Sequence, residues 1–302
     1  MENTWKAHYI YFHHKEKEDR LIQILAKKMM ALREKGEIEK WFFLRYWEGG
    51  PHIRMRYFSS RRFSEEYLFT DLRMYIANHP SPFTLTKQTY YENHKFDGEP
   101  IPMEQLEWYE EGEIIEKDYF PEYERYGGET LMPLTEELFT ASSEFAATCI
   151  QASLDKHYFL RLMLVLAVME DIAVTCKEEG LFGVPVSEFY ENCFRSWQHL
   201  YDLHDLEYAN DIKEGVKKNE ASLKGIYKKI RGWEHYQQFN KSILNGMTKV
   251  FQHTESHQRL RSILYSHLHM FNNRVGITPE YECAIYYSLF NLGGVIYDTQ
   301  SN

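Results

Sequence analysis

The clearest alternation of hydrophobic and polar residues lies at 40–58. Two runs rich in aromatic and β-branched residues, 40–48 and 51–58, flank a Glu-Gly-Gly-Pro segment at 48–51. A glycine pair between such runs indicates a tight turn, because glycine accepts the positive φ that the turn requires. The pattern therefore predicts a β-hairpin.

Side chains of two kinds alternate along the second strand of this hairpin. A period of two residues separates a polar set from an apolar set: His52, Arg54 and Arg56 against Ile53, Met55 and Tyr57. The apolar face is predicted to be core. The polar face fits a solvated outer surface or an anion site, since neighbouring guanidinium groups repel unless an anion lies between them or both reach water.

The surrounding patterns predict a ferredoxin-like unit. Strands are expected at 6–13 and 85–94, and helices at 15–35 and 64–77. Ser64 is the candidate N-cap of the second helix. The order β-α-β-β-α-β places both helices on one face of a four-stranded antiparallel sheet. The face that carries Arg54 and Arg56 is then the open one.

Helical spacing dominates the second half of the chain. Residues 95–120 are acidic and contain Gly and Pro, which is typical of a linker. Helices are predicted at 134–155, 157–178, 187–203, 205–230, 234–253, 256–274 and 279–296. The expected fold class is α+β, with a ferredoxin-like antiparallel sheet unit packed on a mostly helical C-terminal part. The expected domains are 1–95, a linker and active-site loop at 96–130, and a helical part at 131–302.

Composition excludes several classes of protein. A net charge of −10 disfavours nucleic acid as the main partner, because binding phosphates needs a basic surface. The four cysteines are scattered without metal spacing, which predicts buried thiols and no zinc site. Neither a signal peptide nor an apolar run of membrane-spanning length is recognised, so a cytoplasmic protein without a membrane partner is expected.

A histidine pair lies near the end of the helix predicted at 256–274. On that helix His269 and Asn273 are four residues apart and share a face, whereas His267 points elsewhere. A histidine on a helix is more often a structural group than a catalyst. The Asn-Asn-Arg segment at 272–274 is unusual inside a helix, because Asn has low helix propensity, and this indicates a functional polar end.

Three sequence blocks together carry a family resemblance. They are W-F-F-L-R-Y…G-G-P-H-I-R-M-R-Y at 41–57, Y-F-P-E-Y-E-R-Y-G-G at 119–128 and S-H-L-H-M-F-N-N-R at 266–274. In this order they resemble the C-terminal, glutamate-eliminating domain of class I lantibiotic dehydratases, which also occurs as a free-standing protein in thiopeptide pathways. The resemblance implies a lyase that expels glutamate from glutamylated Ser or Thr of a precursor peptide and leaves dehydroalanine or dehydrobutyrine.

The resemblance also implies roles for single residues. Arg54, Arg56 and Arg125 would hold the glutamyl carboxylates and the enolate oxygen. Glu122 would orient an arginine, and His269 would transfer the proton. The implied substrate-binding residues are Arg45, His52, Tyr126, Asn273 and Arg274. We expect the three arginines and His269 to converge on one pocket, without a metal or another cofactor.

The resemblance further implies partners and leaves alternatives open. The partners would be a precursor peptide, with its leader and glutamylated core, and a separate glutamyl-tRNA-dependent enzyme that attaches the glutamate; a homodimer is left open. Free-standing relatives catalyse a [4+2] cycloaddition of two dehydroalanines to form a pyridine, and generally lack the full Arg/Glu/His set. A third alternative is a non-catalytic partner that binds a leader peptide by strand addition. The complete polar set favours elimination.

Overall fold

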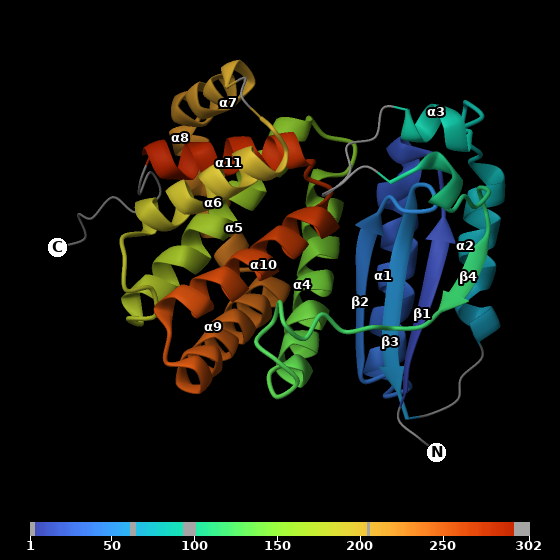
Figure 1. Cartoon of the computed structure of the whole chain (residues 1–302), viewed down its shortest axis with the longest axis horizontal. Helices are drawn as coiled ribbons and strands as arrows, with labels where there is room; N and C mark the ends of the chain where they lie inside the picture. Colours follow the sequence, from blue (N-terminus) through green and yellow to red (C-terminus); the bar gives the residue numbers. More distant parts are fainter. Residues whose placement is uncertain (1–3, 61–64, 93–100, 204–205, 293–302) are drawn as a thin grey trace. The chain divides into compact units, whose positions relative to one another are not determined.

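Strands lie near the N-terminus and helices make up most of the remaining chain in a computed structural model (Figure 1). It describes residues 4–60, 65–92, 101–203 and 206–292. The predicted α+β class is confirmed. The chain divides into a sheet unit, Met1–Pro121 with Ser142–Leu154, and a helical unit, Glu122–Ala141 with Asp155–Asn302. These units differ from the predicted ranges 1–95, 96–130 and 131–302.

One antiparallel sheet forms the centre of the sheet unit. Its strands are β1 (Thr4–Tyr11), β2 (Lys40–Tyr46), β3 (His52–Ser59) and β4 (Ile114–Lys117). The strand order is β2-β3-β1-β4 and every neighbouring pair is antiparallel, which is the ferredoxin-like order. The predicted hairpin is confirmed, with β2 and β3 joined through the two glycines.

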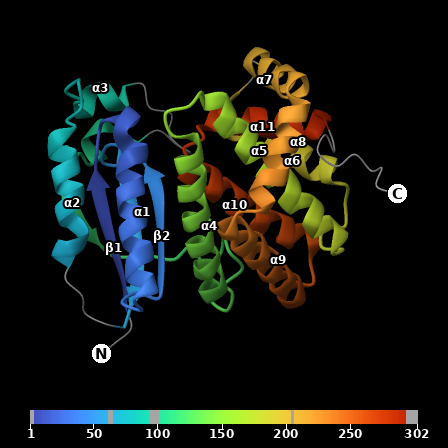
Figure 2. The same cartoon turned by 180° about the vertical axis from the view of Figure 1, so that it is seen from behind.

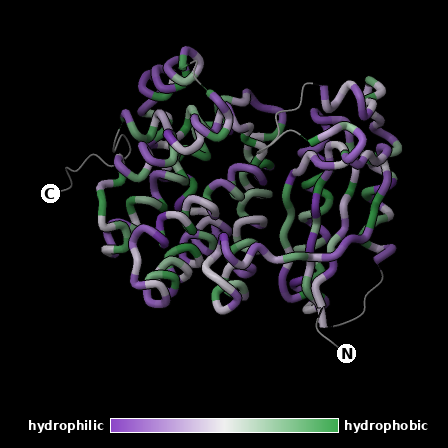
Figure 3. Tube along the Cα trace, viewed as in Figure 1, coloured by the Kyte–Doolittle hydropathy of each residue, from purple (hydrophilic) through white to green (hydrophobic). Residues whose placement is uncertain are grey.

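Two helices cover one face of this sheet. Figure 2 shows α1 (Glu18–Glu34) and α2 (Glu65–Asn78) in front of the strands. Hydrophilic and hydrophobic residues alternate along β3 (Figure 3), and the apolar Ile53, Met55 and Tyr57 are buried, as predicted. Because side chains alternate between the two faces, Arg54 and Arg56 lie on the face opposite to these core residues.

The end of a long helix completes the core of the sheet unit. Helix α4 (Met132–Ser153) begins in the helical unit and ends in the sheet unit. Its buried Glu144 carboxylate accepts hydrogen bonds from Arg33 Nη1 at 2.8 Å and from Trp41 Nε1 at 3.2 Å. This carboxylate therefore ties α4 to both α1 and β2.

The strand predicted at 85–94 is wrong, because helix α3 (Lys87–Tyr91) lies there. Thr86 caps this helix in a reciprocal pair with Thr89, so the threonines that suggested a strand stabilise a helix start instead. The fourth strand is β4, which pairs with β1 inside the predicted linker. Its four residues were too few to give a period. His94 and the candidate cap Ser64 lie outside the described residues.

The remaining helices follow the predicted order closely. They are α5 (Tyr158–Glu178), α6 (Val186–Leu200), α7 (Glu207–Lys218), α8 (Glu220–Arg231), α9 (Glu234–Thr254), α10 (His257–Val275) and α11 (Pro279–Leu292), with short 3-10 turns η1 (Lys15–Lys17) and η2 (Met103–Gln105). The single helix expected at 205–230 is two helices. Asn219 ends the first one, and its side-chain amide donates to Gly215 O at 2.8 Å. No helix within the described ranges is long and apolar enough to cross a membrane.

Candidate active site

Arg54 lies among aromatic rings on the face of the sheet opposite to α1 and α2. Its guanidinium carbon is 3.4 Å from the ring centroid of Tyr46 and 4.5 Å from that of Tyr9. The register explains this, since Arg54 is directly opposite Tyr9 on β1. Its Nη2 donates to Glu48 Oε2 at 3.1 Å, and its Nε donates to His52 Nε2 at 3.1 Å. Four contacts thus fix the direction of this guanidinium.

His52 is neutral, and its ring contacts Arg54 rather than solvent. The side chain is buried, and its Nδ1 lies 2.8 Å from Gly50 O. Burial, together with the neighbouring Arg54 and Arg56 cations, lowers the pKa of His52 to about 3. A neutral ring with a proton on Nδ1 accepts the Arg54 hydrogen bond at Nε2. Its predicted role in substrate binding stays a prediction, since the residue is only 1% exposed.

Arg56 is a cation without an acidic partner in the described part of the chain. Its guanidinium carbon lies 4.9 Å from the ring centroid of Tyr119 and 5.4 Å from that of Phe42. No described carboxylate comes within 4.0 Å of its nitrogens, and its buried Nε has no described acceptor. Burial and the neighbouring Arg54 cation lower the pKa of Arg56, yet an arginine remains charged at neutral pH. A half-buried cation in this state is a candidate anion-binding group.

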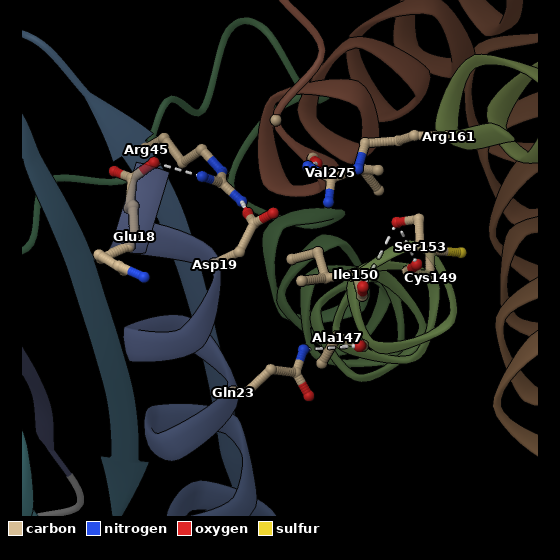
Figure 4. A network of polar contacts seen from close by, with 12 residues as sticks. Glu18, Asp19, Gln23, Arg45, Ala147, Cys149, Ile150, Ser153, Arg161 and Val275 are labelled. Carbon is tan, nitrogen blue, oxygen red and sulfur yellow. Dashed lines mark hydrogen bonds and ion pairs between the residues drawn. The ribbon is translucent and has the colours of Figure 1, made fainter. Parts of the chain in front are cut away.

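Arg45 is on the other face of the sheet. It is opposite Ile53 in the register, so its side chain points to the face that α1 covers. Figure 4 shows its guanidinium against Glu18 and Asp19 of α1, with Asp19 Oδ1 at 2.6 Å from Nη2. Gln23 of the same helix donates to Ala147 O at 2.8 Å. The structure therefore does not bring Arg45 together with Arg54 and Arg56.

A glycine-ended loop presents Arg125 in the helical unit. Its Nη1 donates to Glu122 Oε2 at 3.0 Å, and the orienting role of Glu122 in the reaction stays a prediction. Gly127 follows with a φ of 91°, and a Cβ at this position would lie 2.7 Å from Leu131 Cδ1. Only glycine fits both the backbone angle and the space. The loop can therefore hold Arg125 at one place while about a third of its side chain, 35%, stays exposed.

Several predicted substrate-binding residues are interior groups of the helical unit. Tyr126 is 1% exposed and its ring lies 5.0 Å from the rings of both Phe139 and His267. Arg274 is 0% exposed and its guanidinium carbon is 5.1 Å from the ring of Phe139. Asn273 is half-buried. The polar helix end thus lies mainly in the core, and contact of these residues with substrate stays a prediction.

His267 is the histidine that lies near Arg125. It is buried, its Nε2 has no described hydrogen-bond partner, and burial lowers its pKa to about 3. The cations of Arg274 and Arg125 lower it as well. His267 therefore stays neutral and cannot act as a base that titrates near neutral pH.

His269 forms a dyad with a glutamate that sequence reasoning missed. Its Nδ1 is 3.0 Å from Oε2 of Glu282 on α11, and Glu282 is buried. The Tyr286 hydroxyl donates to the other carboxylate oxygen at 2.5 Å. The ring of Trp197 lies 4.8 Å from the imidazole. This arrangement keeps a proton on Nδ1 and leaves Nε2 without a described partner, as in a histidine base oriented by a carboxylate.

The predicted polar set is divided between the two units. Arg54 and Arg56 belong to the sheet unit, and Arg125 and His269 to the helical unit. Their convergence on one pocket stays a prediction. The sequence does not distinguish Glu282 as a functional residue, because it is one of two acids at the start of a helix. Acids are common there for electrostatic reasons.

Comparisons with known proteins agree with this fold. Residues 5–292 match a family described as the C-terminal part of the lantibiotic biosynthesis dehydratase. No curated protein sequence matches the chain. Among solved structures, the tRNA-dependent lantibiotic dehydratase MibB from Microbispora sp. 107891 is similar, with 18% identity and a TM-score of 0.55 over 98% of this chain. The match covers 28% of MibB, so the chain spans about a quarter of that protein.

Two shorter proteins match along almost their whole length. The pyridine synthase TbtD from thiomuracin biosynthesis has 11% identity and a TM-score of 0.65, over 98% of this chain and 99% of TbtD. TsrL has 15% identity and a TM-score of 0.64, over 98% of this chain and 96% of TsrL. At such identities these likenesses show the fold alone.

Proposed function

Because the chain belongs to the family of lantibiotic biosynthesis dehydratase C-terminal domains, we propose that it eliminates glutamate from glutamylated Ser or Thr of a precursor peptide. The products would be dehydroalanine and dehydrobutyrine. A separate glutamyl-tRNA-dependent enzyme would attach the glutamate beforehand.

The observation that carries this proposal is the Arg56 cation, which has no acidic partner among the described residues. A glutamylated residue brings carboxylate charge to the enzyme, and more negative charge develops as the ester bond breaks. A half-buried guanidinium with aromatic walls and no described acidic partner suits that charge better than a neutral peptide. Its neighbour Arg54 is held by Glu48 and His52, so of these two arginines Arg56 is the one available to an anion.

The dyad of His269 and Glu282 would supply the base for the elimination. Nε2 of His269 would take the Cα proton of the glutamylated residue, and the electrons of that C–H bond would form the Cα–Cβ double bond. The Cβ–O bond breaks, and its electron pair leaves on the glutamate carboxylate. Glu282 would stabilise the imidazolium that forms, while Arg125 would stabilise the negative charge on the enolate or the leaving group.

A [4+2] cycloaddition is the second candidate function. It is favoured by the likeness to the pyridine synthase TbtD, because the two chains match along nearly their full lengths. Its substrate would be a neutral peptide that already contains dehydroalanines. Such a peptide gives no reason for a cation that has no acidic partner in the described part of the chain, so we rank elimination first.

Variants of the two catalytic groups in the helical unit test the proposal. With a glutamylated peptide, the wild-type protein is expected to release free glutamate, and the peptide mass should fall accordingly. Arg125→Ala or His269→Ala should leave glutamyl adducts on the peptide, with a rate loss on the order of 10²–10³, as for removal of an oxyanion donor. Mass spectrometry of the peptide over time measures both. Variants that eliminate as fast as the wild type would contradict the assignment.

A matched pair of arginine variants tests the role of the Arg56 cation. Arg56→Gln should slow elimination on the order of 10²-fold, since it removes the proposed anion clamp. Arg73→Gln is the control, because Arg73 is 53% exposed on α2, on the covered side of the sheet. Equal rates for both variants would show that charge at position 56 has no role in the reaction.

A further inference from the structure

A tyrosine that the proposed chemistry does not yet use lies one helical turn before His269. Tyr265 and His269 are both on α10, four residues apart, so their side chains share a face of this helix. The Tyr265 ring lies 5.9 Å from the ring of Tyr286 and 6.3 Å from that of Trp197. Trp197 also packs against His269, and Tyr286 binds Glu282. One aromatic scaffold thus holds Tyr265 beside the dyad.

The hydroxyl of Tyr265 has no hydrogen-bond partner among the described residues, although the residue is half-buried. Nearby tyrosines differ in this respect. The Tyr286 hydroxyl donates to Glu282 at 2.5 Å, and the Tyr190 hydroxyl donates to Met169 O at 2.6 Å. Buried or half-buried phenols usually find a partner. An unused donor beside a histidine dyad is therefore available to a ligand.

Two charged groups, Glu282 and Arg125, affect the pKa of Tyr265. Burial raises its pKa, the Glu282 carboxylate raises it further, and the Arg125 cation lowers it. Tyr265 therefore lies within electrostatic range of both Glu282 of the dyad and Arg125. The raised pKa keeps the phenol protonated at neutral pH, so the group is a hydrogen-bond donor and not a base.

We infer that Tyr265 is a further catalytic residue, which donates its phenol hydrogen bond to the carbonyl oxygen of the glutamylated residue as His269 removes the Cα proton. This inference rests on the proposed elimination. As the Cα–H electrons move, negative charge develops on the carbonyl oxygen next to Cα, and a donor aimed at that oxygen stabilises the transition state. The phenol keeps its own proton throughout. The proton from Cα goes to His269, and the electron pair leaves with glutamate.

The test is the variant Tyr265→Phe with glutamylated peptide. It removes one oxygen atom that has no described partner, so the thermal unfolding midpoint should stay unchanged. We expect kcat for glutamate release to fall about 10²-fold with KM within about 2-fold, because the contact is made mainly in the transition state. Exchange of the Cα proton in D2O should slow in parallel. The control is Tyr281→Phe, since Tyr281 packs on Tyr158 at 4.9 Å and is expected to keep the wild-type rate.

A second pair of variants keeps the inference testable if the phenylalanine variant does not fold. Tyr265→Gln and Tyr265→Leu both lose the ring, and only the first retains a donor, so the first should be faster. Equal rates for this pair, or a Tyr265→Phe variant as fast as the wild type, would overturn the inference while the proposed elimination stands. Absence of glutamate release by the wild-type protein would instead refute the proposed function.

Discussion

At the scale of single residues, the period of two along β3 predicted on which face of the sheet each side chain lies, which the resemblance alone does not. It placed Arg54 and Arg56 on the face opposite to the core, where the structure has them. The same rule places Arg45 on the other face, against Glu18 and Asp19, whereas the resemblance implied a substrate contact for it. Partners distant in the sequence, such as Glu282 for His269, could not be predicted, because helix packing decides them.

The two buried histidines predict how stability depends on pH. In the folded chain the pKa of His52 and of His267 is about 3, against about 6.5 in an unfolded chain. Below pH ~6.5 the unfolded chain therefore binds protons that the folded chain does not. The free energy of unfolding should fall as the pH drops from ~6.5 towards ~3, by about 1.4 kcal/mol per pH unit for each histidine.

The variant His267→Gln tests this prediction, because it removes one of the two groups. Denaturant unfolding of the wild type and the variant at pH 7, 5 and 4 gives the free energy of unfolding in each case. The variant should lose less stability on acidification than the wild type. Parallel curves for the two proteins would contradict a neutral, buried His267.

At the scale of elements, strong periodic patterns were predicted well and short segments were not. The hairpin and the long helices have enough residues to show their period. Strand β4 has four residues, and only Ile114 and Ile115 are apolar, so pairing with β1 decides its structure. In the segment predicted at 85–94, a local Thr86–Thr89 cap outweighs the β propensity of threonine and tyrosine.

The loop that carries Arg125 gives a prediction about Gly127. Gly127→Ala should reduce glutamate release, because the new Cβ would meet Leu131 at 2.7 Å and displace the loop. Gly128→Ala is the matched control. This glycine also has a positive φ, 98°, but nothing lies within 4 Å of a Cβ there. Both variants should be strained by about 1 kcal/mol or more, and only the first should also move Arg125. Equal rates for the two variants would contradict a steric role for Gly127.

At the scale of the whole molecule, the polar set is spread over two compact units. Sequence order could suggest that Arg56 and Arg125 act in one reaction, but no local pattern decides it. That the arginines of both units act on one glutamylated residue stays a prediction. A double-mutant cycle measures this coupling without requiring knowledge of a distance.

The cycle compares Arg56→Gln, Arg125→Gln and the double variant in glutamate release. If both cations stabilise the same developing charge, the double variant should lose less rate than the product of the two single losses. If the rate loss of the double variant equals the product of the two single losses, Arg56 and Arg125 have independent roles. Unfolding midpoints of the three variants serve as the control for folding.

The most direct test of the central claim is a count of products from the wild-type protein. With a glutamylated precursor peptide, mass spectrometry and a glutamate assay should find one free glutamate for each dehydroalanine or dehydrobutyrine formed. The contrary result would be glutamyl esters that persist while the same protein converts a peptide already containing dehydroalanines into a pyridine-containing ring. That outcome would identify the chain as a cycloaddition enzyme and refute the glutamate lyase.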